Sequence, residues 1–119
     1  MSEKSVEMLG AGEIIAQGDV LIEMVDEIPE GFSDVTPSNG DIIVAHSETG
    51  SHHTVGRSAA RLMRGEDPFT CYLQVTAEYA DLVNLRDVNP HTTVRFPTGF
   101  VKISRQREGD PERLRMVED

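Results

Sequence analysis

The sequence has no tryptophan, only one cysteine and no long run of apolar residues. The last two features narrow the class of protein. A membrane-spanning helix needs roughly 18 consecutive apolar residues, so we expect no such span. Cys71 has no second cysteine to form an internal disulfide with, which favours a reducing, cytoplasmic setting. The first residues also lack the basic start and apolar stretch of a signal peptide, which agrees with that setting.

Motifs for nucleotide binding and for hydrolysis are missing as well. The chain contains no Gly-x-x-x-x-Gly-Lys-Ser/Thr loop, no Gly-x-Gly-x-x-Gly fingerprint and no Gly-x-Ser-x-Gly elbow. Cys71 lies on the apolar face of an alternating segment, so we expect it in the core rather than at an active site. The sequence therefore favours a binding protein over an enzyme.

Basic residues are scarce in the first part of the chain. Residues 1–50 hold eleven acidic residues and one lysine, a net charge of −10, whereas residues 51–119 hold ten of each sign. Such acidity argues against direct binding to nucleic-acid phosphates. It favours a protein partner with a basic face, because complementary charge speeds encounter and selects against wrong partners. A well-solvated acidic surface without a partner is the alternative.

The chain does contain a series of short apolar runs separated by turn residues. The clearest is residues 69–75, whose strict alternation predicts a half-buried strand. The residues predicted to face inward are Phe69, Cys71, Leu73 and Val75, and those predicted to face outward are Thr70, Tyr72 and Gln74. Residues 91–96 and 100–107 are predicted to form a hairpin, with Pro97-Thr98-Gly99 as its turn. Residues 56–64 fit a short helix or a short strand equally well.

Seven or eight such strands with little helix predict an all-β fold, a small barrel or sandwich. We expect this domain to span residues 13–109. Residues 1–12 would form an N-terminal arm, flexible or with a short helix at 5–9. Residues 110–119 would form a charged tail that turns at most once as a helix.

Three of the four histidines fall within residues 46–53, between apolar runs that predict the tip of a hairpin. Imidazoles and a carboxylate are ligands for zinc, iron or nickel. The predicted metal ligands are His46, Glu48, His53 and His91. In this prediction the side chains of His46, His53 and His91 converge, and His52 points to the other side of the hairpin. The alternative is a recognition loop that contacts a partner through Ser51 and His52.

A second candidate site lies near the C-terminus. Phe100, Lys102, Arg105 and Arg107 form an aromatic and basic strip of the kind that binds single-stranded nucleic acid. Such a strip is more often the solvent face of an edge strand, where charge discourages aggregation. Arg105 and Arg107 are therefore retained as candidate binding residues without a nucleic-acid ligand.

The order of the motifs resembles a family of small, largely uncharacterised proteins of bacteria and their phages. Gln17-Gly18-Asp19-Val20 comes first, the histidine turn follows, and Arg105-Gln106-Arg107-Glu108 comes near the end. Members of this family tend to read Gln-Gly-Asp-Val early, a Thr-Gly-His-rich turn in the middle and Gln-Arg-Glu late. The resemblance covers about residues 16–119 and implies no established activity. Ser51 stands where members tend to have a further histidine.

Taken together, these features favour a small acidic accessory or binding protein of phage or prophage origin that acts through a protein partner. It would decorate a viral assembly or inhibit a host defence complex, in the host cytoplasm or in the virion, and could self-associate as a homo-oligomer. The alternative is a cupin-like protein that holds a divalent metal at the histidine turn.

Overall fold

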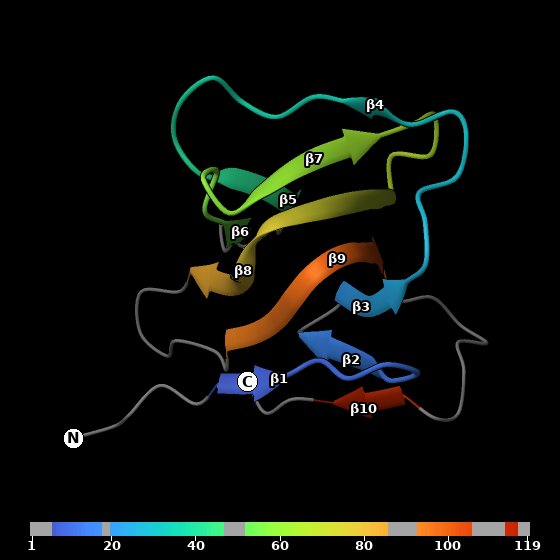
Figure 1. The fold of residues 1–119 in the computed structure, drawn as a ribbon, viewed down its shortest axis with the longest axis vertical. Helices are drawn as coiled ribbons and strands as arrows, with labels where there is room; N and C mark the ends of the chain where they lie inside the picture. Colours follow the sequence, from blue (N-terminus) through green and yellow to red (C-terminus); the bar gives the residue numbers. More distant parts are fainter. Residues whose placement is uncertain (1–5, 18–19, 47–51, 86–92, 106–113, 117–119) are drawn as a thin grey trace.

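The computed structural model describes residues 6–17, 20–46, 52–85, 93–105 and 114–116 (Figure 1). These residues form ten strands and no helix, so the predicted all-β class is confirmed. In chain order the strands are β1 (Val6–Met8), β2 (Ile14–Gln17), β3 (Val20–Val25), β4 (Ser33–Asp34), β5 (Ile42–His46), β6 (His52–Val55), β7 (Ala60–Arg64), β8 (Thr70–Leu85), β9 (Thr93–Arg105) and β10 (Leu114–Met116). No helix among the described residues is long and apolar enough to cross a membrane.

The sheet is built around β8 and β9, the two longest strands, whose antiparallel ladder runs through the middle of the molecule (Figure 1). β9 also pairs with β3 and β1, and β8 also pairs with β7 and β6. β2 and β10 extend the sheet beyond β3, β4 extends it beyond β7, and β5 extends it beyond β6. The path from β10 to β5 is open at both ends, so the sheet does not close into a barrel.

Both long strands bend at one place, where the register of their ladder shifts between Val75 and Tyr79. The backbone amides of Thr76 and Ala77 both donate to the carbonyl oxygen of Ala59, at 3.0 and 3.2 Å. The residues of β8 that belong to the main core change from odd to even numbers across this point: Cys71, Leu73 and Val75, then Ala80 and Leu82. Such a bulge bends a strand and resets which side chains face the core.

The bend shows that the predicted hairpin at residues 97–99 is wrong. Pro97, Thr98 and Gly99 lie inside the continuous strand β9. Pro97 and Thr98 are exposed, and Gly99 has a φ of 142°, which favours glycine. Proline and glycine are tolerated within a strand at such an irregularity, so these residues mark a bend rather than a chain reversal.

The folded sheet encloses one main hydrophobic core. Its largest fully buried apolar side chains are those of Phe96, Ile15, Ile22, Ile42, Leu73 and Leu82. Gln17 Nε2 donates to the carbonyl oxygen of Leu82 at 3.0 Å, although β3 and β9 lie between β2 and β8 in the sheet. Arg64 Nη2 donates to the carbonyl oxygen of Val44 at 3.1 Å and so joins the end of β7 to β5. The sheet therefore folds back across its own inner face.

Residues 26–41 connect β3 to β5 and pass along the outer side of β7 (Figure 1). We call this segment the strap. The Phe32 ring packs edge-on against Tyr72, with ring centroids 4.7 Å apart. The Val35 amide donates to the carbonyl oxygen of Leu62 at 2.8 Å. The close approach of Gly65 to the strap leaves no room for a side chain, because a Cβ there would lie 2.9 Å from the carbonyl oxygen of Gly31.

The strap explains one of two errors in the predicted burial of residues 69–75. Tyr72, predicted to face outward, is only 7% exposed because Phe32 covers it. Phe69, predicted to face inward, is 52% exposed because it precedes the strand, in a turn where its amide donates to Asp67 Oδ1 at 2.9 Å. The remaining predictions are confirmed: Cys71, Leu73 and Val75 are buried, and Thr70 and Gln74 are less so.

Two short segments differ from their sequence interpretation, and a third resolves an ambiguity. Val6–Met8 forms β1, paired in parallel with β9, so the short helix considered at residues 5–9 is wrong. Leu114–Met116 forms β10 on β2 rather than a helical turn. In the ambiguous segment, Ala60–Arg64 is a strand. β1 and β10 are therefore strands that the sequence did not predict.

The buried thiol of Cys71 gives a test of this packing. Burial raises its pKa to about 11, so the unreactive protonated form dominates near neutral pH. We expect a disulfide reagent such as Ellman's to modify the native protein on the order of a hundredfold more slowly than the protein unfolded in guanidinium. Native modification at the rate of a free thiol would contradict the burial of this strand.

The attachment of the strap can be tested through Asp34. Hydrogen bonds from the side chain and backbone of Thr36, and then from Arg61, lower the pKa of Asp34 from 3.8 to about 2. Because the folded pKa is lowered, the ionised carboxylate stabilises the fold above pH 3.8, and this contribution is lost as the pH falls toward about 2. We expect a carboxyl-carbon NMR titration of Asp34 to show this low midpoint, and Thr36→Val to raise it. An unshifted midpoint in the native protein would contradict these bonds.

Candidate functional site

The predicted histidine hairpin is formed by β5 and β6, which pair antiparallel. His46 is the last residue of β5, and His52 and His53 begin β6. The tip of the hairpin, with Glu48 and Ser51, lies outside the described residues, and so do His91 and Arg107.

The strands of this hairpin pair in a register that is shifted at one point. His46 pairs with His52, and Ala45 pairs with His53. Directly opposed residues share a face of the sheet and consecutive residues do not, so this register sets His53 on the same face as Ala45. The reason is a register shift between Ile43 and Ala45, which leaves one extra residue in β5 and exchanges the faces beyond it.

His53 is buried in the core and is hydrogen-bonded there. It is only 2% exposed, and its Nδ1 lies 2.7 Å from Oε1 of the fully buried Gln17. The Gln17 amide nitrogen donates to the carbonyl oxygen of Leu82, so its own oxygen faces His53 and must accept. His53 Nδ1 therefore carries the hydrogen in this contact. This chain of hydrogen bonds links β6, β2 and β8 through the core.

The metal prediction draws no geometric support from the described part of the chain. Among residues 6–17, 20–46, 52–85, 93–105 and 114–116, no three His, Cys, Asp or Glu side chains come together as metal ligands. Glu48 and His91 lie outside these residues, so a site for zinc, iron or nickel stays a prediction.

A cavity of about 480 Å³ lies between β5, the start of β3, the end of β9 and the turn from β7 to β8. Val20, Val44 and Ile103 give it apolar walls, and the charged side chains that line it are those of Arg64, Glu66 and Arg105. The exposed ring of Phe69 also lines it. A volume of roughly 300–1,000 Å³ is typical of small-molecule sites.

The cavity includes one residue that the sequence singled out, in a different setting. Arg105 was grouped with Phe100, but its amide donates to the carbonyl oxygen of Phe69 at 3.1 Å, so its aromatic neighbour at the cavity is Phe69. Sequence reasoning missed Arg64 and Phe69. Their signal was weak, because it consisted only of a cation and an aromatic residue on either side of the turn Gly65-Glu66-Asp67-Pro68.

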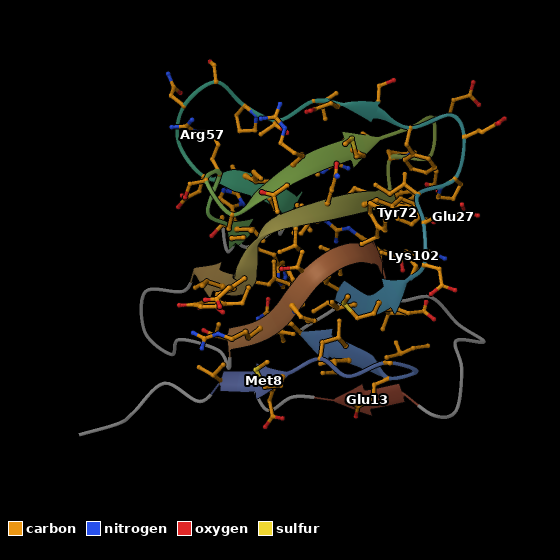
Figure 2. All side chains as sticks on the ribbon, viewed as in Figure 1. Met8, Glu13, Glu27, Arg57, Tyr72 and Lys102 are labelled. Carbon is orange, nitrogen blue, oxygen red and sulfur yellow. The ribbon has the colours of Figure 1, made fainter. Side chains whose placement is uncertain are left out.

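The other chemically distinctive surface is acidic. The end of β3 and the strap carry six acidic residues and no lysine or arginine: Glu23, Asp26, Glu27, Glu30, Asp34 and Asp41. Glu23 is half-buried and the others are exposed. Figure 2 places Glu27 on the outer side of the strap, at the same end of the molecule as Tyr72 and Lys102, while Arg57 lies at the opposite end.

These features define a small all-β domain with an acidic connecting segment on one side and a partly basic cavity at one end of the folded sheet. A family model for a domain of unknown function, DUF8820, matches residues 16–106, so the chain belongs to that family. No curated protein and no solved structure matches it. This match confirms the expectation that the chain belongs to an uncharacterised family.

The buried contact between His53 and Gln17 gives a stability prediction. Replacing His53 with leucine leaves Gln17 Oε1 buried without this donor, which we expect to lower the free energy of unfolding by about 1–3 kcal/mol. Urea unfolding of His53→Leu, Gln17→Leu and the double variant would measure the coupling between the two side chains. Strictly additive losses would show that the two side chains do not act together.

Proposed function

We propose that this protein is an accessory protein that binds a protein partner with a basic face, and that the strap and the end of β3 form its binding surface. The observation that carries this proposal is the run of exposed carboxylates at Asp26, Glu27 and Glu30, in a segment with no basic residue from 23 to 41. Surface charge of one sign steers a partner of opposite charge and rejects wrong ones.

The length of the strap and its attachment to the sheet support a binding role. Connections longer than about 12–15 residues are uncommon in compact domains unless they have a function. The strap spans residues 26–41 and contains only the two-residue strand β4. It is held to the sheet through Phe32 on Tyr72 and through Arg61 Nε, which donates to Asp34 Oδ2 at 2.9 Å. A segment ordered before binding loses little conformational entropy when a partner docks.

Two acidic residues that flank the proposed binding surface stand beside basic residues of the sheet. Glu23 stands opposite Lys102 in the β3–β9 ladder, and Asp34 is bridged to Arg61 at 2.8 Å. Asp26, Glu27 and Glu30 lie between these two positions in the chain and supply the carboxylates of the proposed surface. The resemblance of the motif order to bacterial and phage proteins directs the search for the partner to phage assemblies and host defence complexes.

The proposal is tested by isolating the partner and measuring its association rate. Affinity capture from infected and uninfected bacterial extracts would supply candidates, and each purified candidate would then be tested by stopped flow. We expect the association rate to fall steeply as salt rises, since the screening length shortens from about 10 Å at 0.1 M to about 3 Å at 1 M. Glu27→Lys and Glu30→Lys should each slow association about tenfold at low salt.

Glu78→Lys is the matched control, because it makes the same charge change at an exposed residue on the bend of β8. It should leave the association rate close to that of the native protein. A partner that associates at the same rate in low and high salt, or that responds equally to Glu78→Lys and Glu27→Lys, would contradict binding through the strap.

A further inference from the structure

We propose that the cavity between β5 and the ends of β3, β7 and β9 binds a small organic carboxylate with an apolar body. This site is separate from the acidic surface of the strap, and its ligand has the opposite charge to the partner proposed there. The inference rests on three features of the cavity: its apolar walls, its two arginines and the exposed ring at its rim.

The walls are suited to the apolar part of a ligand. Val20, Val44 and Ile103 line a cavity of about 480 Å³. Such a volume accommodates a ligand of metabolite size. An apolar group placed there removes its own surface from water, which favours binding by roughly 25 cal/mol per Å² buried.

The charged groups are suited to an anion. Arg64 and Arg105 line the cavity together with one carboxylate, that of Glu66, so the charged lining is net positive in a chain whose net charge is −10. The bond from Arg64 Nη2 to the carbonyl oxygen of Val44 fixes the guanidinium at the cavity wall. A guanidinium held in this way meets a carboxylate with paired, charge-assisted hydrogen bonds.

Phe69 supplies a fixed apolar surface at the rim. Its ring is 52% exposed, although its backbone is held on both sides by the bond from its amide to Asp67 Oδ1 and by the Arg105 amide. An exposed ring beside a cavity offers apolar surface that a ligand in the cavity can cover. The Arg105 amide donates to the Phe69 carbonyl oxygen and both residues line the cavity, so an apolar residue and a cationic one stand side by side there.

The test uses simple carboxylates, each paired with its neutral amide. Hexanoate, 3-phenylpropionate and N-acetylphenylalanine would be titrated into the ¹⁵N-labelled full chain, with inorganic phosphate as an anion that has no apolar part. We expect at least one acid to bind with a Kd on the order of 1 mM or below and to shift the amide signals of residues 64–69 and 103–105. Its amide and phosphate should bind at least about tenfold more weakly.

Binding of an acid and its amide with equal affinity would overturn the role of the arginines. If no acid binds at a concentration about tenfold above the expected Kd, the site itself would be overturned. Binding of phosphate as tight as that of the acids would show a site for inorganic anions in place of the proposed one.

Variants then locate the site. Arg64→Gln and Phe69→Ser should each weaken the best acid about tenfold. Arg57→Gln is the matched control, because Arg57 also donates to a backbone carbonyl, that of Gly40, and lies away from the cavity. Equal losses in Arg57→Gln and Arg64→Gln would indicate a general charge effect and contradict the site. Glu27→Lys should leave acid binding intact, so failure of the strap proposal can be told apart from failure of this one.

Discussion

The antiparallel ladder between β8 and β9 is the constraint on which the rest of the fold depends. Four further strands pair directly with these two, and the remaining four are attached through those. The bend in the ladder divides the sheet into two parts that face each other across one core. The cavity lies at the end of this ladder where β9 ends and the turn from β7 leads into β8.

Polar contacts determine how the two parts of the sheet meet. Apolar side chains such as Phe96 and Leu82 favour burial in any arrangement, since the hydrophobic effect has no direction. The bonds from His53 to Gln17 and from Gln17 to the Leu82 carbonyl have defined geometry and are buried. Leaving such groups unpaired in the core is costly, so one alignment of β2 against β6 and β8 is favoured over others. His53 thus has a structural role in the core.

The sequence allowed the fold class and the strand at residues 70–75 to be predicted, because alternation reports the two faces of a strand directly. It did not predict the face of His53, because one extra residue in β5 exchanges the faces and leaves no mark in composition. The burial of Tyr72 depends on Phe32, forty positions earlier in the chain, which no local pattern can report. Arg64 and Phe69 come together at the cavity only through the turn geometry and the fold-back of β5, so their shared surface was missed.

The bend of β8 also limits how a gene for this domain can change length. Thr76 and Glu78 are exposed, so their side chains are open to substitution. The loss or gain of one codon there would turn Ala80 and Leu82 away from the core, because consecutive strand residues face opposite sides. It would also displace the paired amides that meet the Ala59 carbonyl. In the evolution of this domain, insertions and deletions of a single residue should therefore accumulate outside the bend, although the bend is at the surface and free to vary in composition.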